Sequence, residues 1–290
     1  MSATPVWLEV ALNGTWGTGR QPLAPVTADE LVAQAVACAD AGAAVVHLHA
    51  FDDAGRPREA YELYAPVFEA IRSARDVICY PTVPMGPVPA ADASAGRARY
   101  DTVDRLARAG LVEWAVVDPG SLVVATTDEL AAGGEGFLYA NSPADVRAGL
   151  AVCAEHRLVP SFAVYEPGFT RLGAALRVPA APRPVHRFMF SDGFTFGFPP
   201  ATWALDAHLR LLEDCDPGGP WMVAGLGVEL GDLADVAVER GGHVRVGLED
   251  APLGCPTSNE ELVRAAVARV EAGGRRVATP AEVRAATLGA

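Results

Sequence analysis

The sequence contains no lysine, and all 23 of its basic side chains are arginine. Reactions that need a lysine amine are therefore excluded, namely Schiff-base catalysis, anchoring of pyridoxal phosphate and phosphate binding by a P-loop. The codon bias of a GC-rich genome is a sufficient source for this composition, and the chemical consequence holds whatever the source.

Cysteines and long apolar runs are also scarce. The five cysteines are scattered and form no C-x-x-C pair, so we expect neither a disulfide framework nor a thiolate metal site. No apolar run is long enough to cross a bilayer, and the first residues lack the basic-then-apolar pattern of a signal peptide. The net charge of −13 argues against a nucleic-acid partner. We expect a soluble, cytoplasmic protein that acts on small molecules.

Short apolar runs rich in β-branched residues recur along the whole chain. There are eight of them, at residues 6–12, 43–49, 77–81, 114–118, 160–165, 186–190, 221–226 and 243–248. Segments with helical spacing lie between these runs. A serine or threonine in a capping position indicates where four helices begin, at Thr27, Ser142, Ser258 and Thr279.

This alternation predicts the fold class. Eight strands that alternate with helices over about 250 residues are typical of a (β/α)8 TIM barrel, an α/β fold. Continuous apolar runs suit parallel strands that are buried on both faces. We expect a single domain over residues 1–290, with a C-terminal helix at about residues 280–288. An open doubly wound sheet is the weaker alternative, because the glycine-rich residues 13–19 lead into a proline-rich segment where no helix is expected.

Two histidines one residue apart, His47 and His49, end the second apolar run. Residues i and i+2 of a strand point to the same face, so both imidazoles lie side by side while Leu48 points the other way. Such a pair can form half of a zinc or iron site. The alternative is two hydrogen-bonded core histidines, which is the more common situation for a single histidine.

The eighth run brings further polar side chains to the predicted barrel interior. Arg245 and Glu249 share the inward parity of their strand, and Asp250 follows directly. Because strands two and eight flank strand one, Glu249 can converge with His47 and His49 at the carboxyl ends of the strands. Two histidines and one carboxylate leave coordination positions open, as in catalytic metal sites. Asp250 is then a candidate general base.

Arg245 has two possible roles in this arrangement, to clamp a substrate carboxylate or to orient Asp250. A buried Arg245–Glu249 ion pair without a metal remains the alternative interpretation of the eighth run. Elsewhere, His156 and His208 are expected on helix surfaces. The aromatic loop at residues 191–200 is expected on the catalytic face, as a lid, a coenzyme A contact or an oligomer contact.

The chain resembles the β-keto acid cleavage enzymes, typified by 3-keto-5-aminohexanoate cleavage enzyme. The resemblance covers nearly the whole length and rests on five segments, at residues 41–49, 53–57, 164–168, 223–227 and 242–250. It implies a zinc-dependent TIM barrel, commonly a homotetramer. The reaction that it implies converts a β-keto acid and acetyl-CoA into acetoacetate and a new acyl-CoA.

The resemblance also implies roles for individual residues. His47, His49 and Glu249 match the ligands of Zn²⁺ or another divalent metal, Asp250 matches the base, and Arg245 matches the arginine that works with it. A metal that stabilises an enolate replaces the imine that a lysine would form, so this chemistry is compatible with a chain without lysine.

The predicted pocket departs from the family pattern at several positions. Trp16 stands where the family commonly has a glutamate, Pro81 where it has a serine, and Ala163 where it has a strand-borne glutamate. The acidic groups that would hold an ammonium are therefore missing, and we expect a less polar acyl tail than that of an amino-β-keto acid. The predicted substrate-binding residues are Trp16, Pro81, Thr82 and Asp118.

Two other functions remain open. A metal-dependent hydrolase of the amidohydrolase type also uses an H-x-H pair, but on the first strand and usually with a bridging modified lysine. A binding or regulatory protein that kept the metal and lost turnover is compatible with the altered pocket.

Overall fold

The computed structural model describes residues 4–85 and 93–289. Eight parallel strands pair in the order β3–β2–β1–β10–β9–β8–β7–β4. Their bounds are β1 Leu8–Ala11, β2 Val45–Leu48, β3 Ile78–Pro81, β4 Trp114–Val116, β7 Val159–Val164, β8 Val185–Phe190, β9 Trp221–Gly225 and β10 His243–Val246. Each strand falls on one of the eight predicted runs, and strands next to one another in the sheet follow one another along this series. The predicted (β/α)8 TIM barrel is confirmed.

The sheet closes on itself between β3 and β4. Tyr80 of β3 and Trp114 of β4 lie with their ring centroids 5.8 Å apart, so side-chain packing joins these two strands in the described part of the chain. Strand β1 pairs with β2 on one side and with β10 on the other, so these two strands flank it.

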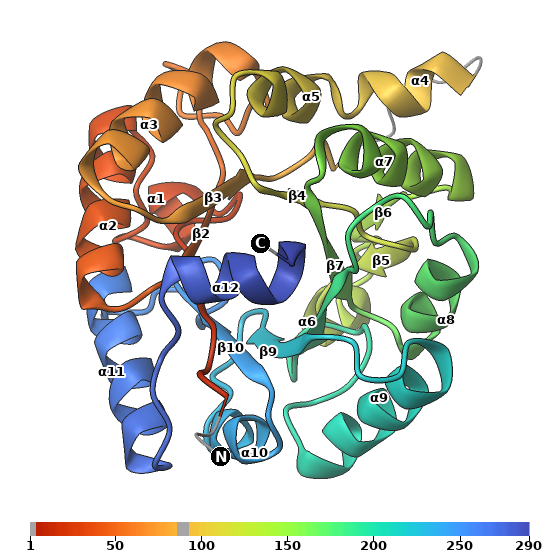
Figure 1. Ribbon diagram of the computed structural model, residues 1–290. Coiled ribbons are helices and arrows are strands. Elements are labelled where there is room, and N and C mark those ends of the chain that lie inside the picture. The colour runs from red at the N-terminus through yellow and green to blue at the C-terminus, as the bar shows by residue number, and fades with distance from the viewer. Residues whose placement is uncertain (1–3, 86–92, 290) are drawn as a thin grey trace.

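Helices surround the strands, as Figure 1 shows. Their bounds are α1 Gly17–Arg20, α2 Ala28–Ala41, α3 Tyr61–Ala74, α4 Ala93–Ala98, α5 Asp101–Arg108, α6 Thr127–Ala131, α7 Pro143–His156, α8 Pro167–Ala175, α9 Thr202–Cys215, α10 Asp232–Glu239, α11 Asn259–Ala272 and α12 Pro280–Leu288. Each of the four predicted cap residues accepts a hydrogen bond from the third residue of its helix. Local capping therefore sets where α2, α7, α11 and α12 begin.

The structure corrects three expectations. A one-turn helix, α1, follows β1 where none was expected. An antiparallel hairpin, β5 Leu122–Val124 with β6 Phe137–Tyr139, follows β4 and carries α6 between its strands. Three-residue strands are too short to show a period in the sequence. His208 is fully buried in α9, stacked 4.6 Å from Phe188, because α9 turns this face toward β8.

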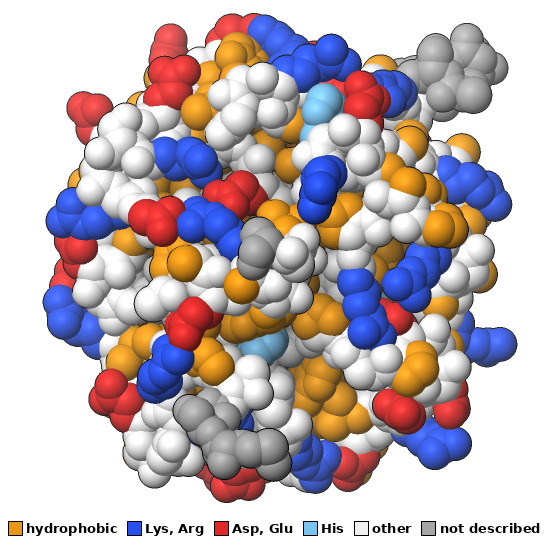
Figure 2. Space-filling view, viewed as in Figure 1, with side chains coloured by type: hydrophobic (Ala, Val, Ile, Leu, Met, Phe, Trp, Pro, Cys, Tyr) orange, Lys and Arg blue, Asp and Glu red, His pale blue; other side chains and the backbone are white. Residues whose placement is uncertain are grey.

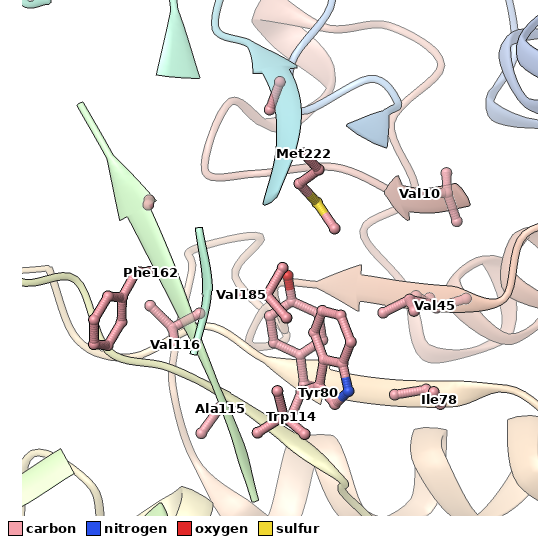
Figure 3. Close-up of a cluster of buried hydrophobic side chains, with 14 of the residues drawn as sticks. Val10, Val45, Ile78, Tyr80, Trp114, Ala115, Val116, Phe162, Val185 and Met222 are labelled. Atoms are coloured by element: carbon pink, nitrogen blue, oxygen red, sulfur yellow. The ribbon is translucent and has the colours of Figure 1, made fainter. Parts of the chain in front are cut away.

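Large apolar side chains fill the part of the barrel interior that lies toward the amino-terminal ends of the strands. In Figure 3 the rings of Tyr80 and Trp114 lie together, with Val185 of β8 beside them and Met222 of β9 nearby. All four side chains are essentially inaccessible to solvent. The barrel is thus a packed core in this layer, and the site lies in the layer nearer the carboxyl ends of the strands.

Helix α12 lies across the amino-terminal end of the barrel, at the front of Figure 1. Its Arg284 pairs with Glu113 and Asp76, which precede β4 and β3. Figure 2 shows this face with arginine and acidic side chains interspersed. Because α12 covers the amino-terminal end of the barrel, the open end is the opposite one.

Among the described residues, no helix is both long and apolar enough to cross a membrane.

Candidate active site

His47, His49 and Glu249 converge at the carboxyl ends of β2 and β10. The Nε2 atom of His47 lies 3.5 Å from Oε2 of Glu249, and Nε2 of His49 lies 3.6 Å from Oε1. Both histidines are buried, at 2% and 3% exposure. The three side chains come together because β1 pairs with β2 on one side and with β10 on the other.

The geometry of this cluster fits a divalent metal. The N···O separations are too long for good hydrogen bonds but close to the ~3.3 Å expected between two ligands of one tetrahedral zinc ion. Among the described residues, Oε2 of Glu249 is a buried atom without a hydrogen-bond partner. Burial holds the pKa of His47 well below its usual value, which keeps the imidazole in the neutral form that metals bind. A donor set of two imidazoles and one carboxylate suits zinc or another divalent transition metal.

Arg245 is surrounded by carboxylates. It donates from Nε and Nη2 to the two oxygens of Asp250, both at 2.8 Å, and from Nη1 to Glu9 at 3.1 Å. Its Nη2 also lies 2.9 Å from Oε1 of Glu249. Arg245 therefore orients Asp250 and has no free edge for a substrate carboxylate. Three carboxylates share this one guanidinium, which leaves an excess of negative charge for a divalent cation to balance.

Two carboxylates beside Arg245, those of Asp250 and Glu249, have pKa values shifted in opposite directions. Burial raises the pKa of Asp250 to about 6, against the opposing effect of the guanidinium. The pKa of Glu249 is held well below its usual value, because Arg245, His47 and His49 together outweigh its burial. Of the two neighbouring carboxylates, Glu249, the candidate ligand, thus stays ionised, and Asp250 takes up a proton more readily.

The backbone around the cluster is held by Asn13 and shaped by Gly247. The side chain of Asn13 accepts from the N–H of His49 and donates to its carbonyl, both at 2.9 Å. Gly247 adopts a φ of +136°, and a Cβ there would lie 2.1 Å from the carbonyl oxygen of Ala11. Only glycine allows β10 to turn at this point and bring Glu249 over β1.

A cavity of about 90 Å³ adjoins the cluster. It is lined by the cluster together with side chains from the other loops and strands, among them Trp16, Thr82, Met85, Val116, Asp118, Phe137, Tyr139, Tyr165, Arg187 and Leu226. Three of the four predicted substrate-binding residues, Trp16, Thr82 and Asp118, thus face this cavity. The indole N–H of Trp16 donates to the carbonyl of Glu249 at 2.8 Å.

Pro81 is a correction, because it does not line the cavity. It pairs in register with Leu48 of β2, whereas its neighbour Tyr80 pairs with His47. Since side chains alternate along a strand, Tyr80 and Thr82 point inward and Pro81 points toward the helices.

Arg245 and Asp250 also lie outside the lining of this cavity. Both instead border a second, mainly apolar cavity of about 340 Å³ between β10 and the helices α10 and α11. Asp250, the residue after Glu249, therefore has its carboxylate outside the cavity that Glu249 lines, where Arg245 donates two hydrogen bonds to it.

Four residues in or beside the candidate site were missed by the sequence reasoning. Glu9, Asn13, Tyr139 and Arg187 are all buried and polar. A signal existed for Glu9 and Arg187, because a charged residue inside an apolar run indicates an inward-facing site. Tyr139 belongs to the short hairpin that the pattern did not reveal.

A second group of potential ligands, Asp104, Glu155 and His156, links α5 to α7. Asp104 accepts from Arg97, Arg108 and His156. Because arginines already satisfy these carboxylates, this group is an ion-pair network with a structural role.

Comparison with known proteins places the chain in a family. A model of the beta-keto acid cleavage enzyme family matches residues 5–288. A 3-keto-5-aminohexanoate cleavage enzyme of Fusobacterium nucleatum is 29% identical over 91% of this chain and 90% of its own length. A 3-oxoadipate:acetyl-CoA acetyltransferase of Cupriavidus necator is 27% identical over 97% of this chain and 94% of its own.

Two further similarities extend this comparison. A 3-dehydrocarnitine:acetyl-CoA trimethylamine transferase of Rhizobium meliloti is 26% identical over 96% of this chain and 95% of its own. The apo structure of ObcA superposes with a TM-score of 0.71 at 17% identity, covering 91% of this chain. This chain spans 65% of the ObcA chain, and at that identity the likeness concerns the fold alone.

Proposed function

The chain belongs to the beta-keto acid cleavage enzyme family and is an enzyme, and from this premise we propose that it transfers acyl groups between a β-keto acid and acetyl-CoA. The products are acetoacetate and a new acyl-CoA. The single observation that carries the proposal is the buried cluster of His47, His49 and Glu249 beside Asp250. The named relatives act on 3-keto-5-aminohexanoate, 3-oxoadipate and 3-dehydrocarnitine, which share a β-keto acid and differ in the tail.

His47, His49 and Glu249 are the residues that would hold the metal, which we propose is zinc. When bound, it supplies a Lewis acid that makes the carbon between the keto and carboxylate groups more acidic. Both imidazoles are buried, Asn13 fixes the backbone of His49 by two hydrogen bonds, and the turn at Gly247 brings Glu249 to them.

Asp250 is the proposed base that removes the proton from this carbon. Because it borders the second cavity, next to Glu249, this role requires its carboxylate to turn toward the bound substrate. Its raised pKa brings its proton affinity nearer to neutrality than that of an exposed aspartate. Arg245 holds the ionised form by two hydrogen bonds to the two carboxylate oxygens. The three carboxylates around the single guanidinium of Arg245 favour a cation at Glu249.

The lining of the cavity supports a less polar tail. Trp16, Met85, Val116, Phe137 and Leu226 all face it. Besides Glu249, the carboxylate in this lining is Asp118, and both of its oxygens already accept hydrogen bonds from Tyr139 and Ala163. An ammonium-bearing tail would therefore meet mainly apolar surface, and burying it would be costly. We therefore propose an uncharged acyl tail in place of an amino-bearing one.

The proposal is tested by incubating the zinc-loaded protein with acetyl-CoA and a panel of β-keto acids, and by measuring acetoacetate and the acyl-CoA formed. We expect both products in equal amounts, with aliphatic tails preferred over amino tails. The absence of acetoacetate from every substrate, at one metal per chain, would refute the proposal. Hydrolysis without coenzyme A would instead identify a metal-dependent hydrolase, and tight binding without product a binding protein.

We also propose that the chain assembles as a homo-oligomer, a tetramer by resemblance to the family. Exposed apolar side chains on and near the hairpin, Val123, Leu130, Phe137 and Leu138, are 42–60% accessible. Surfaces of this kind are commonly buried against another chain. Light scattering on the purified protein measures the mass directly, and a monomer of 30.2 kDa would contradict this part.

A further inference from the structure

Arg187 is a buried cation with few partners. It lies on β8, is 3% exposed, and lines the same cavity as His47, His49 and Glu249. In the described part of the chain its guanidinium makes one hydrogen bond, from Nε to Oγ of Ser161 at 2.8 Å. A guanidinium has five N–H donors, and a buried charge is costly when it is not paired.

The strands beside Arg187 supply no carboxylate. Its register partners are Ala163 on β7 and Met222 on β9. The nearest acidic group is Asp118, whose Oδ1 lies 3.9 Å from Nη2 of Arg187, beyond hydrogen-bond distance.

Asp118 is itself engaged with other donors. Oδ2 accepts from the hydroxyl of Tyr139 at 2.7 Å, and Oδ1 accepts from the N–H of Ala163 at 2.8 Å. These two bonds hold Asp118 back from Arg187. The guanidinium therefore keeps donors for another anion at the cavity.

Arg245 shows what a satisfied guanidinium looks like in this barrel. It contacts three carboxylates at 2.8–3.1 Å, and it does not line the cavity of the metal cluster. Arg187 does line it and contacts none at hydrogen-bond distance. The two interior arginines are thus divided between positioning a protein carboxylate and facing the space where a substrate would lie.

We infer that the guanidinium of Arg187 binds the carboxylate of the β-keto acid, an inference that rests on the proposed function. A β-keto acid anchored at its carboxylate by Arg187 and at its keto oxygen near His47 and Glu249 has its reactive carbon held between the two. Arg187 is then a substrate-binding residue that selects β-keto acids over uncharged β-keto compounds.

The test measures binding of acetoacetate and of methyl acetoacetate, its uncharged ester, to the zinc-loaded protein by calorimetry. In Arg187→Met we expect acetoacetate to bind about 10- to 100-fold more weakly, the loss typical of a charge-assisted hydrogen bond. Methyl acetoacetate should bind wild type and Arg187→Met alike. Arg187→Lys keeps the charge and should recover part of the affinity for acetoacetate.

Arg183→Met is the matched control. Arg183 lies just before the same strand but at the opposite end of the barrel, where it pairs with Asp216. This variant should bind acetoacetate as the wild type does, and the melting temperature of each variant reports whether it is folded.

Equal affinity of wild type and Arg187→Met for acetoacetate would overturn the inference while leaving the proposed function intact. A loss confined to β-keto acids with a second carboxylate in the tail would also overturn it, since Arg187 would then serve the tail. If acetoacetate does not bind the zinc-loaded wild type at all, both the inference and the proposed function fail.

Discussion

The two ends of the barrel each hold a buried group of histidine and carboxylate side chains, but the carboxylates differ in how many hydrogen bonds they accept. At the amino-terminal end, both oxygens of Asp216 accept hydrogen bonds, from Arg183, Arg177 and His186. At the carboxyl end, His47 and His49 lie 3.5 and 3.6 Å from Glu249, and Oε2 of Glu249 has no hydrogen-bond partner in the described chain.

Hydrogen bonding distinguishes a structural group from a candidate functional one. Residue types alone do not separate them, because both combine a buried histidine and a buried carboxylate with an arginine. Donors and acceptors that satisfy one another contribute to stability and leave nothing for a ligand. Donors and acceptors that face a common point without bonding are available to a third group, such as a metal ion.

The largest effect is expected from a substitution in the carboxyl-end group, because this group, and not the amino-terminal one, is proposed to bind a metal. His49→Ala removes a proposed ligand, so we expect the variant to bind no zinc and to lose far more activity than the ~100-fold typical of changing a residue that only orients a ligand. The fold should remain, because a large barrel core does not depend on the metal. Elemental analysis and melting temperature are the measurements.

His186→Ala is the control for that comparison. It should keep one zinc per chain and its activity, and should unfold at a lower temperature. Stoichiometric zinc in His49→Ala would show that the ligands are misassigned.

A somewhat smaller effect is expected from Asp250→Asn. The amide cannot accept the proton but has nearly the same shape, so kcat should fall by about 10²- to 10⁴-fold, the usual contribution of a general base. Zinc content and binding of acetoacetate should stay near wild type. An unchanged kcat would assign proton removal to another group.

The amino-terminal group should show its role through pH. The pKa of Asp216 is lowered to about 2, because hydrogen bonds from His186 and Arg183 outweigh its burial. Since the folded pKa lies below the unfolded one, the stabilisation is present above about pH 4 and is lost as the pH falls toward 2. Asp216→Asn should therefore lose about 2 kcal/mol of unfolding free energy at pH 6.

Urea unfolding at pH 6 and at pH 2 measures this contribution. The difference between wild type and Asp216→Asn should shrink at the lower pH. A difference of equal size at both pH values would mean that Asp216 stabilises the fold through packing and not through its charge.

The smallest effect is expected at Trp16, which contacts the candidate metal site through one hydrogen bond from its indole N–H to the backbone of Glu249. Trp16→Phe removes the hydrogen bond to the carbonyl of Glu249 and keeps an aromatic ring in the cavity. Zinc affinity, measured by competition with a chelator, should weaken by about 2- to 10-fold. A loss as large as that of His49→Ala would mean that this bond, and not the ligand set, holds the site together.

Much of the fold was predictable because it depends on local patterns. The eight apolar runs became the eight barrel strands, and the caps at Thr27, Ser142, Ser258 and Thr279 became helix starts. The hairpin Leu122–Val124 with Phe137–Tyr139 was not predicted, since its strands are too short to carry a period. The burial of His208 depends on which face α9 turns toward β8.

The site was predictable where parity along one strand decides it, as for His47 and His49. The outward direction of Pro81 was open to the same reasoning, since its parity is opposite to that of Tyr80. The partners of Arg245 and Arg187 were not predictable, because they lie on other strands. Glu9, for example, is 236 positions away from Arg245 in the sequence.

The barrel, the absence of lysine chemistry and the placing of two histidines on one face could be read from the sequence, since each depends on composition or on the spacing of near neighbours. The tertiary structure was needed to show that Arg245 contacts three carboxylates, while Arg187 faces the cavity with one neutral hydrogen bond. The reason is that the register and closure of the eight strands set which side chains meet across the barrel, and the sequence of one strand carries no information about that meeting.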